Sequence, residues 1–190
     1  MKKSIYLLTV LILAFSWYQI RHSFNQADNI TNASIIHVNS LHEMFKGFKL
    51  LGQSKPYGNI YGDQLYVLPE EQWLRTKFIE GFRRYKKLNG LDKYSSERND
   101  CDDYARSTIQ YLNLIHNKTF KVNAAICVGE FWYIPERNNA KTQALSGHCI
   151  NIFLARSSTT EGVVLFFDAQ LEEFIELTDK EILSCIVLKI

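Results

Sequence analysis

Asn99-Asp100-Cys101-Asp102-Asp103-Tyr104-Ala105 is the stretch that decides the fold, because it places a cysteine among acids where a helical pattern begins. Asp100 is a suitable N-cap, and helically spaced residues continue to Ile115. A thiol in the first turn lies where backbone N–H groups converge and where they can stabilise an oxyanion. The polar neighbours argue against a buried core thiol, so we predict that Cys101 is a nucleophile.

Two candidate partners for Cys101 follow it along the chain. His148 comes after Gly147 and begins an apolar run, and Asp168 ends the apolar run 163–167. In an antiparallel meander the start of one strand lies beside the end of the next, so these side chains are expected to meet. The histidine would act as general acid and base, and the carboxylate would fix its tautomer. The alternative is a structural histidine and a turn-forming aspartate.

The order of the patterns predicts an α+β fold, with N-terminal helices packed on an antiparallel sheet and the nucleophile at a helix start. Helices are expected over 41–51, 70–88 and from Asp100 onward. Strand-like segments follow at 120–134, 149–155, 163–167, 174–177 and 186–190, with a further short one within 61–68.

Composition excludes several classes of protein. The 190 residues are 46% hydrophobic with a net charge of +2, which gives no field for nucleic acid. The basic run 83–87 is interpreted as a solvated helix face. Four cysteines without a C-x-x-C spacing form neither a zinc ribbon nor a disulfide framework, so buried free thiols are expected besides Cys101.

The N-terminus predicts export. Lys2 and Lys3 precede an apolar run, so residues 1–22 are a signal peptide or a retained membrane anchor. Residues 23–40 are polar and are expected to be a tether, which leaves 41–190 as the folded domain. The expected location is the cell envelope or the extracellular space, with membrane attachment through the N-terminal segment if it is uncleaved.

The three motifs together resemble the papain-like and transglutaminase-like cysteine protease superfamily. Besides the cysteine stretch they are Gly-His-Cys-Ile-Asn-Ile-Phe at 147–153 and Phe-Phe-Asp-Ala-Gln at 166–170. Two branches are similar: the bacterial transglutaminase-like cysteine proteinases, and the papain-like domain of a mushroom agglutinin with its phage and bacterial relatives. The second fits better, because Asn151 and Gln170 match its Gly-His-Ala-x-Asn and Glu-Pro-Gln patterns. The resemblance covers about 61–178.

The resemblance implies a Cys101–His148–Asp168 triad, with Asn151 and Gln170 as supporting or substrate-binding residues. Asp168 and Ala169 depart from the glutamate and proline of the agglutinin branch. No glutamine stands just upstream of Cys101 as an oxyanion donor, and Gln72 is a remote candidate. No cofactor is required, but the agglutinin relatives are linked with calcium, which would place Asp102 and Asp103 near a metal ion.

Two functions follow from these motifs. The first is an exported or membrane-tethered thiol hydrolase that cleaves an amide or peptide bond of a protein or peptide substrate through a thioester, with transamidation open to it. The alternative is a non-catalytic binding module on the same fold at the cell envelope. Reactivity of the Cys101 thiol distinguishes the two.

Overall fold

The computed structural model describes residues 30, 33–47, 59–60, 62–91, 100–119, 123–136, 147–158 and 162–190. The predicted signal peptide or anchor lies outside these residues. Within them, no helix combines the length and the apolar character needed to cross a bilayer.

Strands form two sheets in the described residues. The smaller sheet has the order β1-β3-β4, and the larger has the order β2-β9-β5-β6-β7-β8. The bounds are β1 Ser34–His37, β2 Asn59–Ile60, β3 Leu65–Leu68, β4 Ala125–Ile126, β5 Val128–Tyr133, β6 His148–Ala155, β7 Val163–Asp168, β8 Glu173–Ile175 and β9 Val187–Lys189. β5 to β8 form the expected antiparallel meander, whereas β2 pairs with β9 and β3 with β4 in parallel.

Helices flank the larger sheet. They are α2 Val38–Gly47, α3 Glu71–Trp73, α4 Ile79–Leu88, α5 Cys101–Thr119 and α6 Asp179–Leu183, with a π-helical turn, η1 Leu74–Phe78, between α3 and α4. The helix expected over 70–88 is therefore continuous, with a wider π-helical turn inside it. It ends at Asn89 and Gly90, where glycine adopts the left-handed φ of 69° that other residues disfavour.

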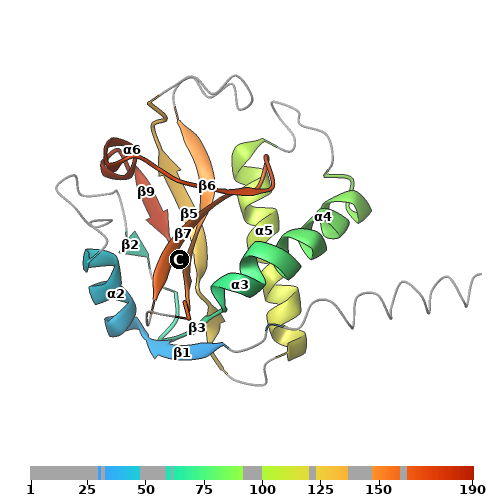
Figure 1. The fold of residues 1–190 in the computed structure, drawn as a ribbon, viewed down its shortest axis with the longest axis horizontal. Coiled ribbons are helices and arrows are strands. Elements are labelled where there is room, and N and C mark those ends of the chain that lie inside the picture. Colours follow the sequence, from blue (N-terminus) through green and yellow to red (C-terminus); the bar gives the residue numbers. More distant parts are fainter. Residues whose placement is uncertain are drawn as a thin grey trace, which may run out of the picture.

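Two apolar cores lie on the two faces of the sheet. Figure 1 shows α3, α4 and α5 on one side of β5, β6 and β7, and α2 and α6 on the other. Phe78 is the centre of the first core and contacts Phe82, Tyr111, Phe153 and Phe167. The second core holds Leu41 and Phe45 of α2, among other residues. Every residue of β6 is buried between these cores, which fixes the strand that carries His148.

The α+β class is confirmed, and two expectations need correction. The tether predicted over 23–40 is too long, because β1 pairs along β3 and α2 begins at Val38. β1 is only four residues long and lies at the edge of its sheet, so its sequence shows no strong strand pattern. The basic run 83–87 is not wholly solvated, because Lys86 is buried.

Candidate functional site

Cys101 occupies the first turn of α5. The Asp100 carboxylate accepts a hydrogen bond from the Asp103 N–H at 3.4 Å, as an N-cap does. The α5 backbone begins with the Tyr104 N–H donating to the Asp100 carbonyl at 3.0 Å. The first-turn N–H groups of a helix lack intrahelical acceptors. The partly buried Cys101 sulfur therefore lies at the positive end of a 19-residue helix.

His148 and Asp168 form a buried pair. The His148 Nε2 and the Asp168 Oδ2 lie 2.9 Å apart, and each side chain is 2% exposed. The second carboxylate oxygen accepts the N–H groups of Gln170 at 2.9 Å and Leu171 at 3.0 Å. The adjacent β6 and β7 bring the start of one strand to the end of the other, as the meander predicts. The carboxylate is thus fixed by its own turn and directed at the ring.

The environment of His148 favours its charged form. Burial of the ring disfavours the charge, but the hydrogen bond to Asp168, the nearby Cys101 thiol and the charges of both raise the pKa of His148 to about 9. Among the described residues, no group makes a regular hydrogen bond to the buried Nδ1, although Cys101 is close enough to raise the ring pKa. The ring of Tyr133 packs edge-on against the imidazole at 5.9 Å. One ring nitrogen therefore contacts the carboxylate, and the other does not share that contact.

Cys101 is the one cysteine that is not fully buried. Cys127, Cys149 and Cys185 are free and buried, as the composition predicts. Burial raises the pKa of Cys127 and Cys185 to about 12, and it also raises that of Cys149 well above its ordinary value. These three thiols are therefore poor nucleophiles beside Cys101.

Asn151 lies within the fold and does not line a cleft. It is 0% exposed, and its Nδ2 donates to the Ala105 carbonyl of α5 at 2.9 Å and to the Gly129 carbonyl of β5 at 3.3 Å. Ala105 is one helical turn beyond Cys101, and Asn151 is three residues beyond His148. The side chain therefore links the helix of the thiol to the strand of the imidazole.

The two predicted glutamines lie in different places. Gln170 follows Asp168 directly in the turn and is partly buried, with an Oε1 that has no partner among the described residues. Gln72 is exposed on α3, two residues after Glu70, which bridges to Arg156 beyond the far end of β6. The eight residues of β6 span roughly 25 Å. Gln72 is therefore not part of this site, and its proposed role as an oxyanion donor is wrong.

A cluster of acids surrounds the helix start. Asp100, Asp102 and Asp103 each offer an oxygen within 4.8 Å of the others. Such oxygens suit a hard cation such as calcium. Arg106 already contacts Asp102 at 2.6 Å and Asp103 at 3.8 Å, and it also lies 3.6 Å from the buried Glu130. The donor set fits calcium in kind, but a guanidinium shares it.

The pKa values of two acids in this cluster shift in opposite directions. The hydrogen bond to Asp102 is the main reason that the pKa of Asp100 is raised, and the same bond is the main cause of the lowered pKa of Asp102. A cation bound here would compensate for the mutual repulsion of these carboxylates.

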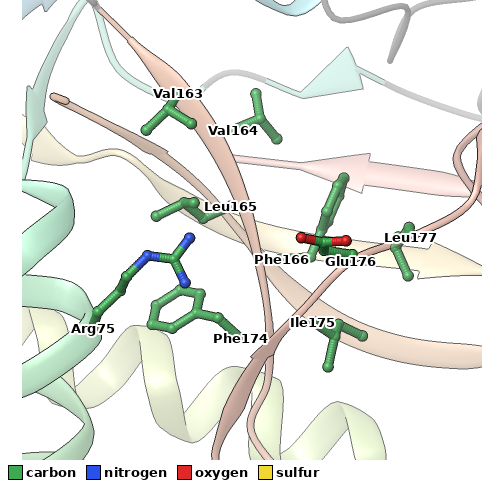
Figure 2. Close-up of a pocket in the computed structure, with 9 residues that line it drawn as sticks. All are labelled: Arg75, Val163, Val164, Leu165, Phe166, Phe174, Ile175, Glu176 and Leu177. Atoms are coloured by element: carbon green, nitrogen blue, oxygen red, sulfur yellow. The ribbon is translucent and has the colours of Figure 1, made fainter. Parts of the chain in front are cut away.

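A pocket of about 420 Å³ lies away from Cys101, His148 and Asp168. It opens where β8 diverges from β7, toward the end of β7 opposite Asp168, and Figure 2 shows the Arg75 guanidinium beside the Phe174 ring. The guanidinium carbon is 5.3 Å from that ring centre. The lining residues are Arg75, Val163, Val164, Leu165, Phe166, Phe174, Ile175, Glu176 and Leu177. None of the predicted catalytic residues borders it.

Lys86 is a buried charged residue near Asp168 that the sequence did not indicate. Lys86 belongs to a basic run whose other members indicate a solvent-exposed surface. Only its position four residues after Phe82, on the same face of the helix, could have indicated that it points toward the core. Its Nζ contacts the turn that follows Asp168.

The fold and site together define an α+β domain with a cysteine at a helix start and a buried histidine–aspartate pair on the neighbouring sheet. No protein-family model matches the chain, and no curated protein sequence matches it either.

Solved structures do share the fold. One is a Polyporus squamosus lectin bound to the human-type influenza-binding epitope Neu5Acα2-6Galβ1-4GlcNAc, with a TM-score of 0.57 and 20% identity. Another is described as a PSL1a–E64 complex, with a TM-score of 0.51 and 18% identity. In both cases 82% of this chain matches 49% of the other, so this chain spans about half the length of those proteins. The resemblance to the agglutinin branch is confirmed at the level of the fold.

Proposed function

We propose that this protein is a thiol hydrolase of the papain-like type, with Cys101 as nucleophile, His148 as general acid and base, and Asp168 as the orienting acid. The observation that carries the proposal is the buried 2.9 Å contact between His148 and Asp168, with the ring close to a thiol at a helix start. A surface histidine or a simple turn aspartate would not require this arrangement.

The geometry supports acyl transfer in two steps. The Cys101 sulfur attacks a carbonyl carbon while His148 holds the thiol proton, and the N–H groups of the α5 first turn face the developing oxyanion. His148 then gives the proton to the leaving amine, which leaves a thioester on Cys101. Water, or a competing amine, attacks the thioester with the imidazole as base. Water gives hydrolysis and an amine gives transamidation.

The structure described as a PSL1a–E64 complex supports this proposal. E64 is an epoxide that alkylates nucleophilic thiols, so a shared fold makes it a suitable probe for Cys101. The buried state of the other three cysteines restricts the reaction to one residue.

The test is alkylation of the purified protein by E64, followed by intact and peptide mass spectrometry. We expect one adduct, on Cys101, and none in Cys101→Ala. Cys127→Ala is the matched control, because it removes a buried thiol and should label as the wild type does. Labelling of Cys101 no faster than that of a small free thiol at the same pH contradicts the proposal.

The second candidate function is glycan binding by a non-catalytic module. The observation in its favour is that one structure with this fold is a lectin in complex with a sialylated glycan. The match covers about half of that protein, so the glycan can be bound by the other half. Calorimetry with the sialylated trisaccharide decides: binding that survives in Cys101→Ala, together with an inert Cys101, favours the module.

The proposal also covers the cellular location of the domain and a calcium site. We propose that residues 1–22 export or tether the domain, so that its protein or peptide substrates lie at the cell envelope or outside the cell. Asp100, Asp102 and Asp103 would hold calcium, which would supply positive charge at the helix start. Isothermal titration with calcium tests the ion site, and Asp102→Asn should abolish any binding seen.

A further inference from the structure

We propose that Lys86 is a positioning residue, which fixes the turn behind Asp168 and the start of α5 relative to each other. This inference rests on the proposed function, because it assigns Lys86 a role in aligning Asp168, His148 and Cys101. It adds a residue that lies outside the three motifs and comes from a different helix, α4.

The first argument is the burial of a charge. Lys86 is 5% exposed, although it belongs to a helix whose neighbouring cations reach solvent. Burial of an ammonium is strongly unfavourable unless partners compensate for the lost hydration. The Nζ has such partners: it donates to the Ala169 carbonyl at 3.1 Å and contacts the Glu172 carboxylate at 2.9 Å.

The second argument is where these partners lie. Ala169 and Glu172 belong to the turn that begins at Asp168, in which the Glu172 N–H donates to the Asp168 carbonyl at 2.7 Å. The N–H groups of Gln170 and Leu171 donate to the Asp168 carboxylate. Glu172 has a φ of 60°, which is unfavourable for a residue with a side chain. Contacts from outside the turn therefore stabilise the conformation that directs Asp168 toward His148.

The third argument is a contact of the same ammonium with α5. The Nζ lies 4.4 Å from the centre of the Tyr104 ring, a cation–π distance. Tyr104 is three residues after Cys101, on the same side of the α5 first turn. One side chain thus contacts the turn of the acid and the helix of the nucleophile.

Arg83 provides a matched comparison on the same carboxylate. Its Nε donates to Glu172 at 2.7 Å, but its side chain is 58% exposed. The pKa of Glu172 is lowered, because the bonds and charges of Lys86 and Arg83 outweigh its burial. Arg83 contacts the turn from a solvent-exposed position, so its loss removes charge beside Glu172 while the contact of Lys86 with α5 remains.

The experiment compares Lys86→Met with Arg83→Met in the full chain. Methionine retains the apolar stem and removes the charge and its hydrogen bonds. We expect Lys86→Met to lower the E64 alkylation rate on the order of tenfold to hundredfold. Arg83→Met should change it by about twofold at most. Faster amide exchange at Gln170 and Leu171 in Lys86→Met provides a readout that does not depend on reactivity.

The pKa of His148, followed by NMR, separates positioning from simple electrostatics. Removal of a nearby positive charge alone would raise the pKa of His148, whereas loss of a well-placed Asp168 lowers it from about 9 toward 6.5. We expect the pKa of His148 to fall in Lys86→Met. Lys86→Arg should restore part of the E64 alkylation rate. A rise in the pKa of His148 in Lys86→Met overturns the inference. So does a folded Lys86→Met with the wild-type alkylation rate and wild-type amide exchange at Gln170 and Leu171.

Failure of the Lys86 inference and failure of the proposed function give different results. If Lys86→Met does not fold, Glu172→Gln decides, because it weakens one contact of the ammonium and should give the same changes at smaller size. If Glu172→Gln changes neither the alkylation rate, nor the amide exchange, nor the pKa of His148, the inference fails. A wild type that E64 does not label refutes the proposed function. In that case the exchange at Gln170 and Leu171 still shows whether Lys86 fixes the turn.

Discussion

Replacement of Asp168 by asparagine tests the histidine–aspartate pair. Asparagine has nearly the same shape and its oxygen can still accept the N–H groups of Gln170 and Leu171, so the turn is preserved. Its amide nitrogen then faces the His148 Nε2. The His148 Nε2 can then only accept a hydrogen bond from the asparagine N–H. The ring proton therefore moves to Nδ1, on the side of Cys101. The substitution removes the charge and selects the tautomer that cannot take the thiol proton.

The magnitude follows from the environment of the ring. The rise of the His148 pKa from 6.5 to about 9 corresponds to roughly 3 kcal/mol, at about 1.4 kcal/mol per pH unit. Burial acts against this rise, and Asp168 contributes both a hydrogen bond and a charge to it. With asparagine only burial and Cys101 remain, so we expect the pKa to fall to its ordinary value or below it.

The assay is an NMR titration of the His148 ring carbon-bound protons in wild type, Asp168→Asn and Asp179→Asn. Asp179 is exposed at the start of α6, so its variant removes the same charge without touching the ring. A wild-type pKa near 6.5, or one that stays near 9 in Asp168→Asn, refutes the reasoning.

The same pair predicts how stability depends on pH. His148 has a folded pKa above its unfolded one, so its contribution is complete below pH 6.5 and is lost as the pH rises through about 9. We expect the free energy of unfolding to decrease by up to roughly 3 kcal/mol across this window in the wild type. Urea titrations at several pH values should show a flatter profile for Asp168→Asn.

Four other substitutions test the scaffold. Asn151→Leu should cost about 1–3 kcal/mol and slow alkylation of the site, whereas Thr108→Val, which removes a buried bond within one helix, should leave the alkylation rate near wild type. Gly129→Ala should destabilise by about 1–3 kcal/mol in urea unfolding, because the new Cβ would overlap the Lys189 carbonyl oxygen. Thr178→Ala removes the capping box of α6 and should cost about 1 kcal/mol without changing E64 labelling.

Local patterns were sufficient to predict much of this fold. The cap at Asp100, the helix start at Cys101 and the meander from β5 to β8 follow from spacing of a few residues. The adjacency of His148 and Asp168 follows from strand order alone, since neighbouring antiparallel strands bring a start to an end. These features depend on local propensity and on short connections.

The remaining features depend on contacts between distant segments. Lys86 looks solvated until the turn after Asp168 is placed against α4, 83 residues away in sequence from its Ala169 partner. β1 gains its place from pairing with β3, which no local pattern specifies. The prediction of Gln72 as an oxyanion donor fails because the sequence does not show that α3 begins beyond the far end of β6.

The energetics of the buried polar groups favour a site over a mere framework. An ionised pair such as His148 and Asp168, at 2% exposure, contributes less to stability than apolar side chains of similar size would. A sheet that serves only as a scaffold would pack better with such apolar residues. Lys86 adds a buried charge beside Asp168 and Asn151 adds a buried amide, and both contact the helix that begins at Cys101. The His148–Asp168 pair, Lys86 and Asn151 thus surround the start of the helix that carries Cys101, and the proposed chemistry at that thiol would explain why such costly polar groups are buried there.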